Sequence, residues 1–153
     1  MKRTAGVGCL VLLASMPAWG VCIVEPLEPQ LRAADTVYVG TVIRSQLTSN
    51  LETLGALKDP RKRSAEIEHT LVPQIVLKGE PSQAPSVVSS WRYNDPRAAT
   101  VVEFSEQATL TPGDTVLVIA RSGEQTRYSL CSATRKWDRD AIKATRAVFR
   151  LKP

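Results

Sequence analysis

The sequence predicts a mainly β domain of five or six short antiparallel strands, closed into a barrel or packed as a sandwich, with a C-terminal helix. Three observations lead to this class. β-Branched and aromatic residues gather in short runs that are separated by turn residues. No helical pattern between these runs is long enough for the crossovers of a parallel sheet. Only the stretch after Asp138 changes to the 3.6-residue period of an amphipathic helix.

The N-terminus has the pattern of a removable export signal. Two basic residues at positions 2 and 3 precede an uncharged, mostly apolar run, and small residues follow at Ala18 and Gly20. The apolar run is about half of the roughly 20 residues that a membrane-spanning helix needs. We therefore expect residues 1–20 to be a cleaved signal peptide and residues 21–153 to form one soluble domain, in the periplasm or outside the cell.

Removal of this signal leaves a small and only slightly basic chain. Its 18 basic and 15 acidic residues give a net charge of +3, against +5 for the whole sequence. Two cysteines remain, Cys22 and Cys131. In an oxidising compartment they are most simply interpreted as a disulfide, with two buried free thiols as the alternative. A bridge that closes a loop of about 110 residues would stabilise the domain by on the order of 4 to 5 kcal/mol.

The expected elements follow the turn signals along the chain. A short helical turn is expected at 30–35, and strands are expected at 36–44, 66–77, 86–92, 100–104, 115–120 and 126–131. Gly40 predicts a bulge or bend in the first strand, and Pro73 predicts an edge or a bulge in the second. The turn signal around Gly123 predicts that the last two strands form a hairpin. Residues 45–65 are the least regular segment and predict a loop of unusual length.

The C-terminal stretch predicts a helix with two different sides. Asp138 has the side chain that is typical of an N-cap. One side of the helix is apolar apart from a threonine, and the other is basic: they consist of Ile142, Thr145, Val148 and Phe149, and of Arg139, Lys143, Arg146 and Arg150. A solvated charged face is the ordinary interpretation of the basic side, and an acidic partner is the more specific one.

Few residues are suited to catalysis. His69 is the only histidine, it falls within an expected strand, and the sequence has no G-x-S-x-G nucleophile turn. We expect it to be a structural or surface histidine. A zinc site needs three or four ligands, which one histidine and two cysteines that are expected to be bonded to each other do not provide. The sequence therefore predicts a protein that is not an enzyme and has no metal or other cofactor.

Nucleic acid is not expected as a partner either. Small barrels often bind single strands through aromatic side chains in a basic groove. Aromatic residues make up only 5% of this chain. Trp91 and Tyr93 could stack on bases, but a tryptophan in a small β domain is more often part of the core. Gly113 and Gly123 are isolated turn glycines, so there is no phosphate-binding glycine loop.

Five segments occur in an order that is shared with a known family. They are 34–42 (ADTVYVGTV), 76–79 (VLKG), 110–119 (LTPGDTVLVI), 130–134 (LCSAT) and 137–138 (WD). In this order the chain resembles the tissue inhibitors of metalloproteinases and the netrin-like modules, in particular their short exported bacterial versions. The resemblance covers nearly all of the chain after residue 20. It implies an OB-like barrel of five strands that is closed by a C-terminal helix.

The resemblance also implies roles for the cysteines. In that family the second cysteine of an N-terminal C-x-C bonds to the cysteine that Cys131 matches, so Cys22 takes that role. The first family cysteine falls on Gly20 and its partner falls near positions 101–104, and neither is a cysteine here. Animal inhibitors chelate the zinc of the protease through the amine and carbonyl of an N-terminal cysteine. This chain, cut after Gly20, would begin with Val21 instead.

Together these observations predict an exported, non-enzymatic OB-fold module that binds a protein or another envelope component, with an acidic partner as the more specific interpretation. OB folds usually bind through the loop after the first strand, so Arg61, Lys62 and Arg63 are the first candidate residues. The second candidates, on the basic C-terminal face, are Arg135, Lys136, Arg139 and Lys143. One alternative is a metallopeptidase inhibitor that acts through an N-terminal ridge of Val21 and Cys22. A third and least favoured reading is an envelope hydrolase that depends on His69.

Overall fold

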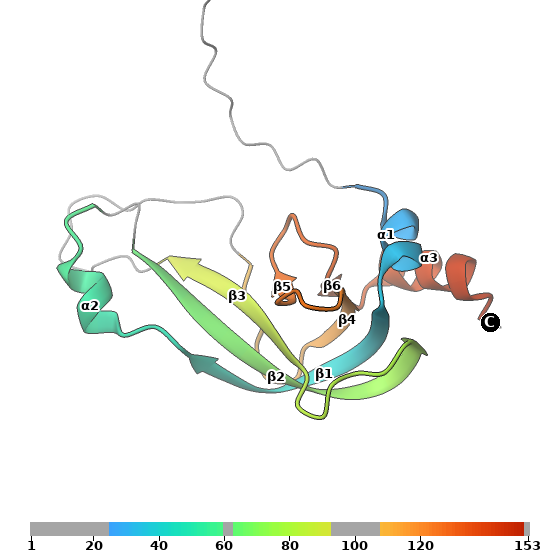
Figure 1. Ribbon diagram of the computed structural model, residues 1–153, viewed down its shortest axis with the longest axis horizontal. Helices are drawn as coiled ribbons and strands as arrows, with labels where there is room; N and C mark the ends of the chain where they lie inside the picture. The colour runs from blue at the N-terminus through green and yellow to red at the C-terminus, as the bar shows by residue number, and fades with distance from the viewer. Residues whose placement is uncertain (1–24, 60–62, 93–107, 152–153) are drawn as a thin grey trace, which may run out of the picture.

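The computed structural model describes residues 25–59, 63–92 and 108–151. In chain order its elements are α1 (Leu27–Ala33), β1 (Thr36–Leu47), α2 (Leu51–Ala56), β2 (Ser64–Lys78), β3 (Ser86–Arg92), β4 (Thr115–Ala120), β5 (Arg127–Tyr128), β6 (Arg135–Lys136) and α3 (Arg139–Phe149). The strands form one six-stranded sheet in the order β5-β3-β2-β1-β4-β6. The predicted mainly β class with a C-terminal helix is therefore confirmed (Figure 1).

The sheet curls into a nearly closed barrel because its two end strands approach each other. A bridge between Tyr128 of β5 and Thr134, directly before β6, links the two ends. Thr134 is buried, and its Oγ1 accepts a hydrogen bond of 3.1 Å from the backbone N–H of Ile119 in β4. The side chain of Thr134 thus joins the end of the sheet to its central part.

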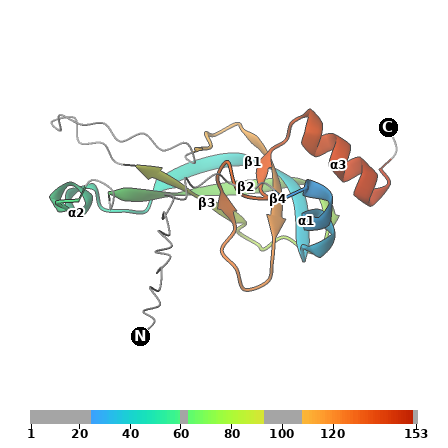
Figure 2. The ribbon, with the colours of Figure 1, turned by 90° about the horizontal axis from the view of Figure 1, so that it is seen from above.

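The core has two parts because β1 and β4 are buried on both faces. The barrel interior contains one set of side chains, Tyr38, Val42, Leu71, Val87, Leu110, Val116, Val118 and Tyr128. The alternate residues of the same two strands, among them Val37, Val39 and Leu117, pack against Leu31 of α1 and Ala141 of α3 on the outer face. Figures 1 and 2 show α1 and α3 side by side at this end of the molecule, with α2 at the opposite end.

The predicted hairpin between β4 and β5 is wrong. β4 pairs with β1 and β6, whereas β5 runs parallel to β3, so the sheet is mixed rather than fully antiparallel. Two hydrogen bonds draw the connecting turn away from a hairpin. The carboxylate of Asp35 accepts from the N–H of Ser122 at 2.7 Å, and the carbonyl of Thr126 accepts from the N–H of Val88 in β3 at 2.9 Å. The chain therefore passes from β4 to the other end of the sheet order, where β5 pairs with β3.

The segment 45–65 is more regular than predicted. β1 continues to Leu47, and α2 follows. Asn50 caps this helix, because its side-chain oxygen accepts from the N–H groups of Glu52 and Thr53. The prediction failed here because the helix has only six residues, too few for a periodic pattern. The predicted strand at 100–104 and the predicted signal peptide lie outside the described residues.

Gly40 and Pro73 mark irregularities, as predicted. The register of β1 and β2 shifts between Val39 and Gly40, which lie opposite Ile75 and Pro73. Pro73 also lies beyond the part of β2 that pairs with β3, which ends at Thr70. A proline is compatible with this position because it lies at a register shift toward β1 and beyond the pairing with β3.

His69 is buried in the barrel wall, so the surface alternative for this residue is wrong. Its side chain is 0% exposed, and its two ring nitrogens lie 2.8 Å from Oγ of Ser45 and 2.7 Å from Oγ of Ser89. A neutral imidazole suits two hydroxyl groups, since it can donate to one and accept from the other. Burial lowers the pKa of His69, and the nearby charge of Asp114 opposes this shift.

We expect this histidine to make the stability of the protein depend on pH. Because its pKa in the folded state is lower than the usual 6.5, the unfolded chain takes up a proton first as the pH falls. The contribution of His69 to the free energy of unfolding is complete above pH 6.5. It is lost as the pH falls toward the pKa of the folded state. Urea unfolding between pH 7.5 and pH 5 should show this decline, and His69→Gln should flatten it. An equal decline in the variant would contradict this origin.

Candidate binding surface

The first predicted set of binding residues is only partly described. Arg61 and Lys62 lie outside the described residues. Arg63 precedes β2, and its side chain is half-buried. Its Nε donates a hydrogen bond of 2.9 Å to the carbonyl of Leu57, just after α2. Arg63 thus fastens the end of α2 to the start of β2, which leaves it less available for a ligand than the sequence suggested.

The second predicted set divides into two pairs. Arg135 and Lys136 form the two-residue strand β6 at one end of the sheet order. Arg139 and Lys143 are exposed one turn apart on α3. The helix begins where the sequence predicted, because the side chain of Asp138 accepts from the N–H of Ala141 at 2.8 Å.

Arg135 and Lys136 line a hollow that the sequence could not reveal. Its volume is about 300 Å³, and its other lining residues are Tyr128, Ser129, Leu130, Ser132 and Asp138. Leu130 is the most exposed of the large apolar side chains in the described part of the chain, at 58%. We call this region the β5–β6 hollow. It brings an exposed leucine, a tyrosine, hydroxyl groups and both signs of charge to one place.

An ion pair organises the charges of the β5–β6 hollow. Nζ of Lys136 lies 3.0 Å from Oδ1 of Asp114, and Oδ2 of Asp114 accepts from the N–H of Thr111 at 2.8 Å. Burial alone would raise the pKa of Asp114, but these hydrogen bonds and the charge of Lys136 outweigh it and lower the pKa. The carboxylate therefore stays ionised at neutral pH and compensates the charge of Lys136.

The inner wall of the hollow is a tyrosine that stays neutral. Tyr128 belongs to the barrel core and is 8% exposed. Burial raises the pKa of its hydroxyl; Lys136 opposes the shift, while Asp114 and Asp138 add to it. At physiological pH Tyr128 is therefore a phenol that can donate a hydrogen bond.

The rim of the hollow is a tight turn that is held by its own serines. The N–H of Ser129 donates to Oγ of Ser132 at 2.9 Å, and the N–H of Cys131 donates to Oγ of Ser129 at 3.2 Å. This turn leaves Leu130 and Cys131 exposed. The predicted partner of Cys131, Cys22, lies outside the described residues, and so does Val21, so the bridge and the N-terminal ridge stay predictions.

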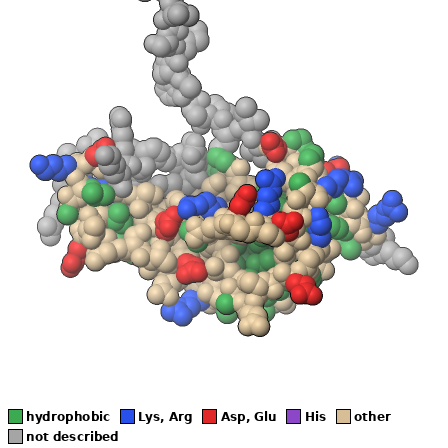
Figure 3. Space-filling view, viewed as in Figure 1, with side chains coloured by type: hydrophobic (Ala, Val, Ile, Leu, Met, Phe, Trp, Pro, Cys, Tyr) green, Lys and Arg blue, Asp and Glu red, His purple; other side chains and the backbone are tan. Residues whose placement is uncertain are grey.

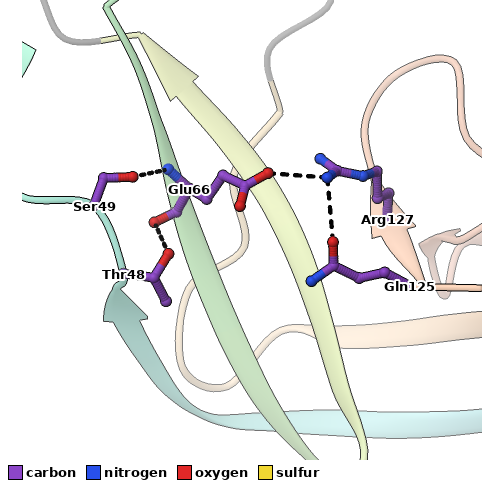
Figure 4. Close-up of polar contacts among 5 residues, drawn as sticks. All are labelled: Thr48, Ser49, Glu66, Gln125 and Arg127. Atoms are coloured by element: carbon purple, nitrogen blue, oxygen red, sulfur yellow. Dashed lines mark hydrogen bonds and ion pairs between the residues drawn. The ribbon is translucent and has the colours of Figure 1, made fainter.

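A polar network secures β5 against the neighbouring strands (Figure 4). Nη2 of Arg127 donates to the carboxylate of Glu66 at 2.9 Å and to the amide oxygen of Gln125 at 3.2 Å. On the other side of β2, the backbone of Glu66 bonds to the hydroxyl groups of Thr48 and Ser49, each at 2.9 Å. The exposed ion pair adds little stability by itself, but the network fixes the direction of the chain as it enters β5.

The surface carries no broad patch of one charge on the face that Figure 3 shows. Basic and acidic side chains alternate across it. Within the described ranges no helix is long and apolar enough to cross a membrane. The same ranges contain no group of three or more histidine, cysteine or acidic residues that could hold a metal ion. Neither a family model nor a curated protein matches the sequence.

Sequence reasoning missed three residues of this surface, Asp114, Tyr128 and Leu130. Asp114 stands in a Thr-Pro-Gly-Asp turn and Tyr128 in a short strand, and both positions have ordinary local explanations. Leu130 carried the only usable signal, because the Ser-Leu-Cys-Ser turn is an unusual place for a large apolar residue. The barrel brings Tyr128 and Leu130 to one hollow and Asp114 to Lys136, which sequence spacing does not show.

The Asp114–Lys136 pair yields a stability prediction. Asp114→Ala leaves the N–H of Thr111 and the amine of Lys136 without this acceptor, so it should lower the free energy of unfolding by about 1 kcal/mol at pH 7. Because the pKa of Asp114 is lowered, this difference should persist above pH 3.8 and shrink as the pH falls below it.

Urea unfolding of the two proteins measures the effect. Glu68→Ala is the matched control, since it removes an exposed carboxylate of the same charge from β2. Equal destabilisation by both substitutions would show that the ion pair and its hydrogen bonds contribute nothing specific.

Proposed function

We propose that this chain is an exported binding module for a protein or another envelope component, and that it binds through the β5–β6 hollow. The observation that carries the proposal is the exposure of Leu130 beside Tyr128 and Arg135. Protein interfaces typically combine an apolar anchor with tyrosine and arginine side chains in one place. The hydrogen-bonded turn that presents Leu130 provides a rigid anchor, which lowers the entropy cost of binding.

The surroundings of the hollow favour a partner with acidic groups at its rim. Arg139 and Lys143 are exposed on α3, which begins three residues after β6. Lys136 adds less, because Asp114 compensates its charge. The basic loop that the sequence favoured first is less well supported, since the side chain of Arg63 holds the backbone at Leu57.

The proposed module is not an enzyme. The single histidine of the chain, His69, is 0% exposed and lies between the hydroxyl groups of Ser45 and Ser89. A general base must come within hydrogen-bond reach of a substrate, and the ring of His69 has both nitrogens occupied inside the wall. An envelope hydrolase that depends on this residue is therefore the least supported reading.

A kinship with the tissue inhibitors of metalloproteinases and the netrin-like modules remains part of the proposal. The barrel with its C-terminal helix supports it, together with the order of the motifs. The alternative function, metallopeptidase inhibition through a ridge of Val21 and Cys22, would use the same surface. A bond from Cys22 to Cys131 would place that ridge beside Leu130.

The binding proposal is tested by comparing two double variants. The mature domain is used to capture partners from an envelope extract. Leu130→Ser with Arg135→Ala should abolish capture of the partner, because the anchor and the cation beside it are removed. The control, Ile43→Ser with Arg146→Ala, removes a leucine-sized side chain of similar exposure, 56%, and an exposed arginine at other places, and should capture normally. Mass spectrometry of the bound fractions identifies the partner.

Two other results of the same experiment would overturn this site. Equal capture by both double variants would remove the β5–β6 hollow from consideration. Loss of capture only in the triple variant Arg61→Ala, Lys62→Ala and Arg63→Ala would move the site to the loop before β2. The captured partner is then tested with the purified mature domain, and a metallopeptidase whose activity falls on binding would favour the inhibitor alternative.

The proposed bridge and the start of the mature chain are tested together. Intact-mass measurement of exported protein should give a chain that begins at Val21 and lacks the hydrogens of two thiols. Cys131→Ser should lower the free energy of unfolding by on the order of 4 kcal/mol, and reduction of the wild type should have the same effect. A reduced wild-type protein of unchanged stability would contradict the bridge. A chain that begins at Cys22 would favour the inhibitor alternative.

A further inference from the structure

A second hollow lies at the mouth of the barrel, away from the β5–β6 hollow. It has a volume of about 330 Å³ and is bounded by the loop before β3 and the turn between β4 and β5. Its lining residues are Thr36, Tyr38, Glu80, Pro81, Ser82, Ala84, Pro85, Ser86, Ala120, Arg121, Ser122, Glu124, Gln125 and Thr126. None of them lines the β5–β6 hollow.

One of the residues that line this barrel mouth is a buried tyrosine. Tyr38 of β1 is 3% exposed and lines the hollow. Within the described part of the chain its hydroxyl has no hydrogen-bond partner, unlike the hydroxyl groups of Ser45 and Ser89 in the barrel wall. Burial raises the pKa of Tyr38 to about 12, so the group is a neutral donor at physiological pH. A buried hydroxyl without a partner is unfavourable, and a ligand that bonds to it would relieve this cost.

The wall of the barrel mouth is fixed before any ligand arrives. The carboxylate of Asp35 holds the N–H of Ser122 at 2.7 Å, and a hydrogen bond from Ser122 is the main reason that the pKa of Asp35 is lowered. The next part of the turn is held through Gln125, whose amide oxygen accepts from Nη2 of Arg127 (Figure 4). The carbonyl of Thr126 accepts from the N–H of Val88 in β3. A wall that is already ordered loses little entropy on binding.

The lining groups define the chemistry of the ligand. Hydroxyl groups predominate, and Gln125 adds an amide that both donates and accepts. Arg121 supplies one positive charge, while Glu80 and Glu124 supply negative ones, so neither a strong anion nor a strong cation is favoured. The apolar lining residues are alanines and prolines, which are small and offer no large apolar surface to a hydrophobic ligand. Alternating donors and acceptors suit a molecule that carries several hydroxyl groups.

We propose that the barrel mouth binds a neutral, polyhydroxylated molecule, namely a sugar unit, and that the Tyr38 hydroxyl forms a hydrogen bond to it. The volume is at the lower end of the roughly 300–1,000 Å³ of ligand pockets, which suits a single sugar ring. The mouths of β-barrels are frequent places for such sites. The site is independent of the proposed protein partner, because the two hollows share no lining residue.

The test is an NMR titration of the mature domain with separate probes. Glucose, galactose and N-acetylglucosamine represent the neutral sugars, and acetate, ethylamine and a neutral dipeptide represent other classes. At least one sugar should shift the amide signals of residues 80–86 and 120–126 in a saturable way. Absence of such shifts with every sugar, or stronger binding of any non-sugar probe to these residues, would overturn the proposal.

Tyr38→Phe separates a role in binding from a role in folding. The substitution keeps the ring in the core and removes only the hydroxyl, so it should weaken sugar binding about tenfold. Stability should not fall, because the hydroxyl has no hydrogen-bond partner among the described residues that the substitution would remove. Unchanged affinity in this variant would overturn the proposed contact, and a loss of stability would show that the hydroxyl serves the fold.

A double variant at the rim keeps the test independent of the core. Arg121→Gln with Gln125→Ala should abolish the shifts. Arg146→Gln with Gln74→Ala is the matched control, since it makes the same changes at exposed positions on α3 and β2 and should leave the binding unaltered. Equal sugar binding by the two double variants would overturn the site. The capture of a protein partner should be normal in both, which separates this proposal from the proposed function.

Discussion

The burial of β1 on both of its faces is the constraint on which the rest of this structure depends. Tyr38 and Val42 point into the barrel, whereas Val37 and Val39 point to α1 and α3. A shift of one residue in the pairing of β1 would exchange these two sets. The exchange would place the tyrosine under the helices and would leave the barrel interior with only one of its two tyrosines among the described residues. The register of β1 with β2 and β4 therefore fixes both the core and the place of the helices.

The two strands that close this barrel are very short. β5 and β6 have two residues each, and a bridge from Tyr128 to Thr134 joins their ends. Strands this short cover only part of the barrel interior. The turns next to them therefore line surface hollows. Both hollows that we consider as sites arise in this way, where the chain between β4 and α3 leaves and rejoins the sheet. The polar groups in these walls are accessible because the closing strands end early.

Local signals in the sequence predicted the elements better than their pairing. The density of β-branched residues located β1, β3 and β4 to within a few residues, and the N-cap of α3 at Asp138 was correct. The hairpin of β4 and β5 failed because Asp35 and Val88, which are distant in sequence, hold the intervening turn. No single-sequence pattern contains such contacts.

The candidate site was also predictable only as far as local sequence signals reach, because contacts between distant residues decide the rest. Arg135 and Lys136 were identified from the charge of the C-terminal segment, and they do line a hollow. The role of Asp114, which compensates Lys136 from a position 22 residues earlier, could not be foreseen. Arg63 was assigned to a binding loop because of its basic neighbours, but its contact with Leu57 turns it inward to the backbone. A run of like charges predicts that these residues lie at the surface. Whether each basic side chain is available to a ligand depends on the hydrogen-bond acceptors that the fold brings near it.

The two hollows have different chemistry although one continuous segment contributes to both. The β5–β6 hollow combines an exposed leucine with an ion pair, which suits a protein surface. The barrel mouth combines hydroxyl groups around a buried phenol, which suits a small polar molecule. Within the part of the segment that forms the β5–β6 hollow, Thr134 is buried, and its Oγ1 bonds to both the N–H and the carbonyl of Ile119. The two hollows share no lining residue, so the two sites are expected to act independently.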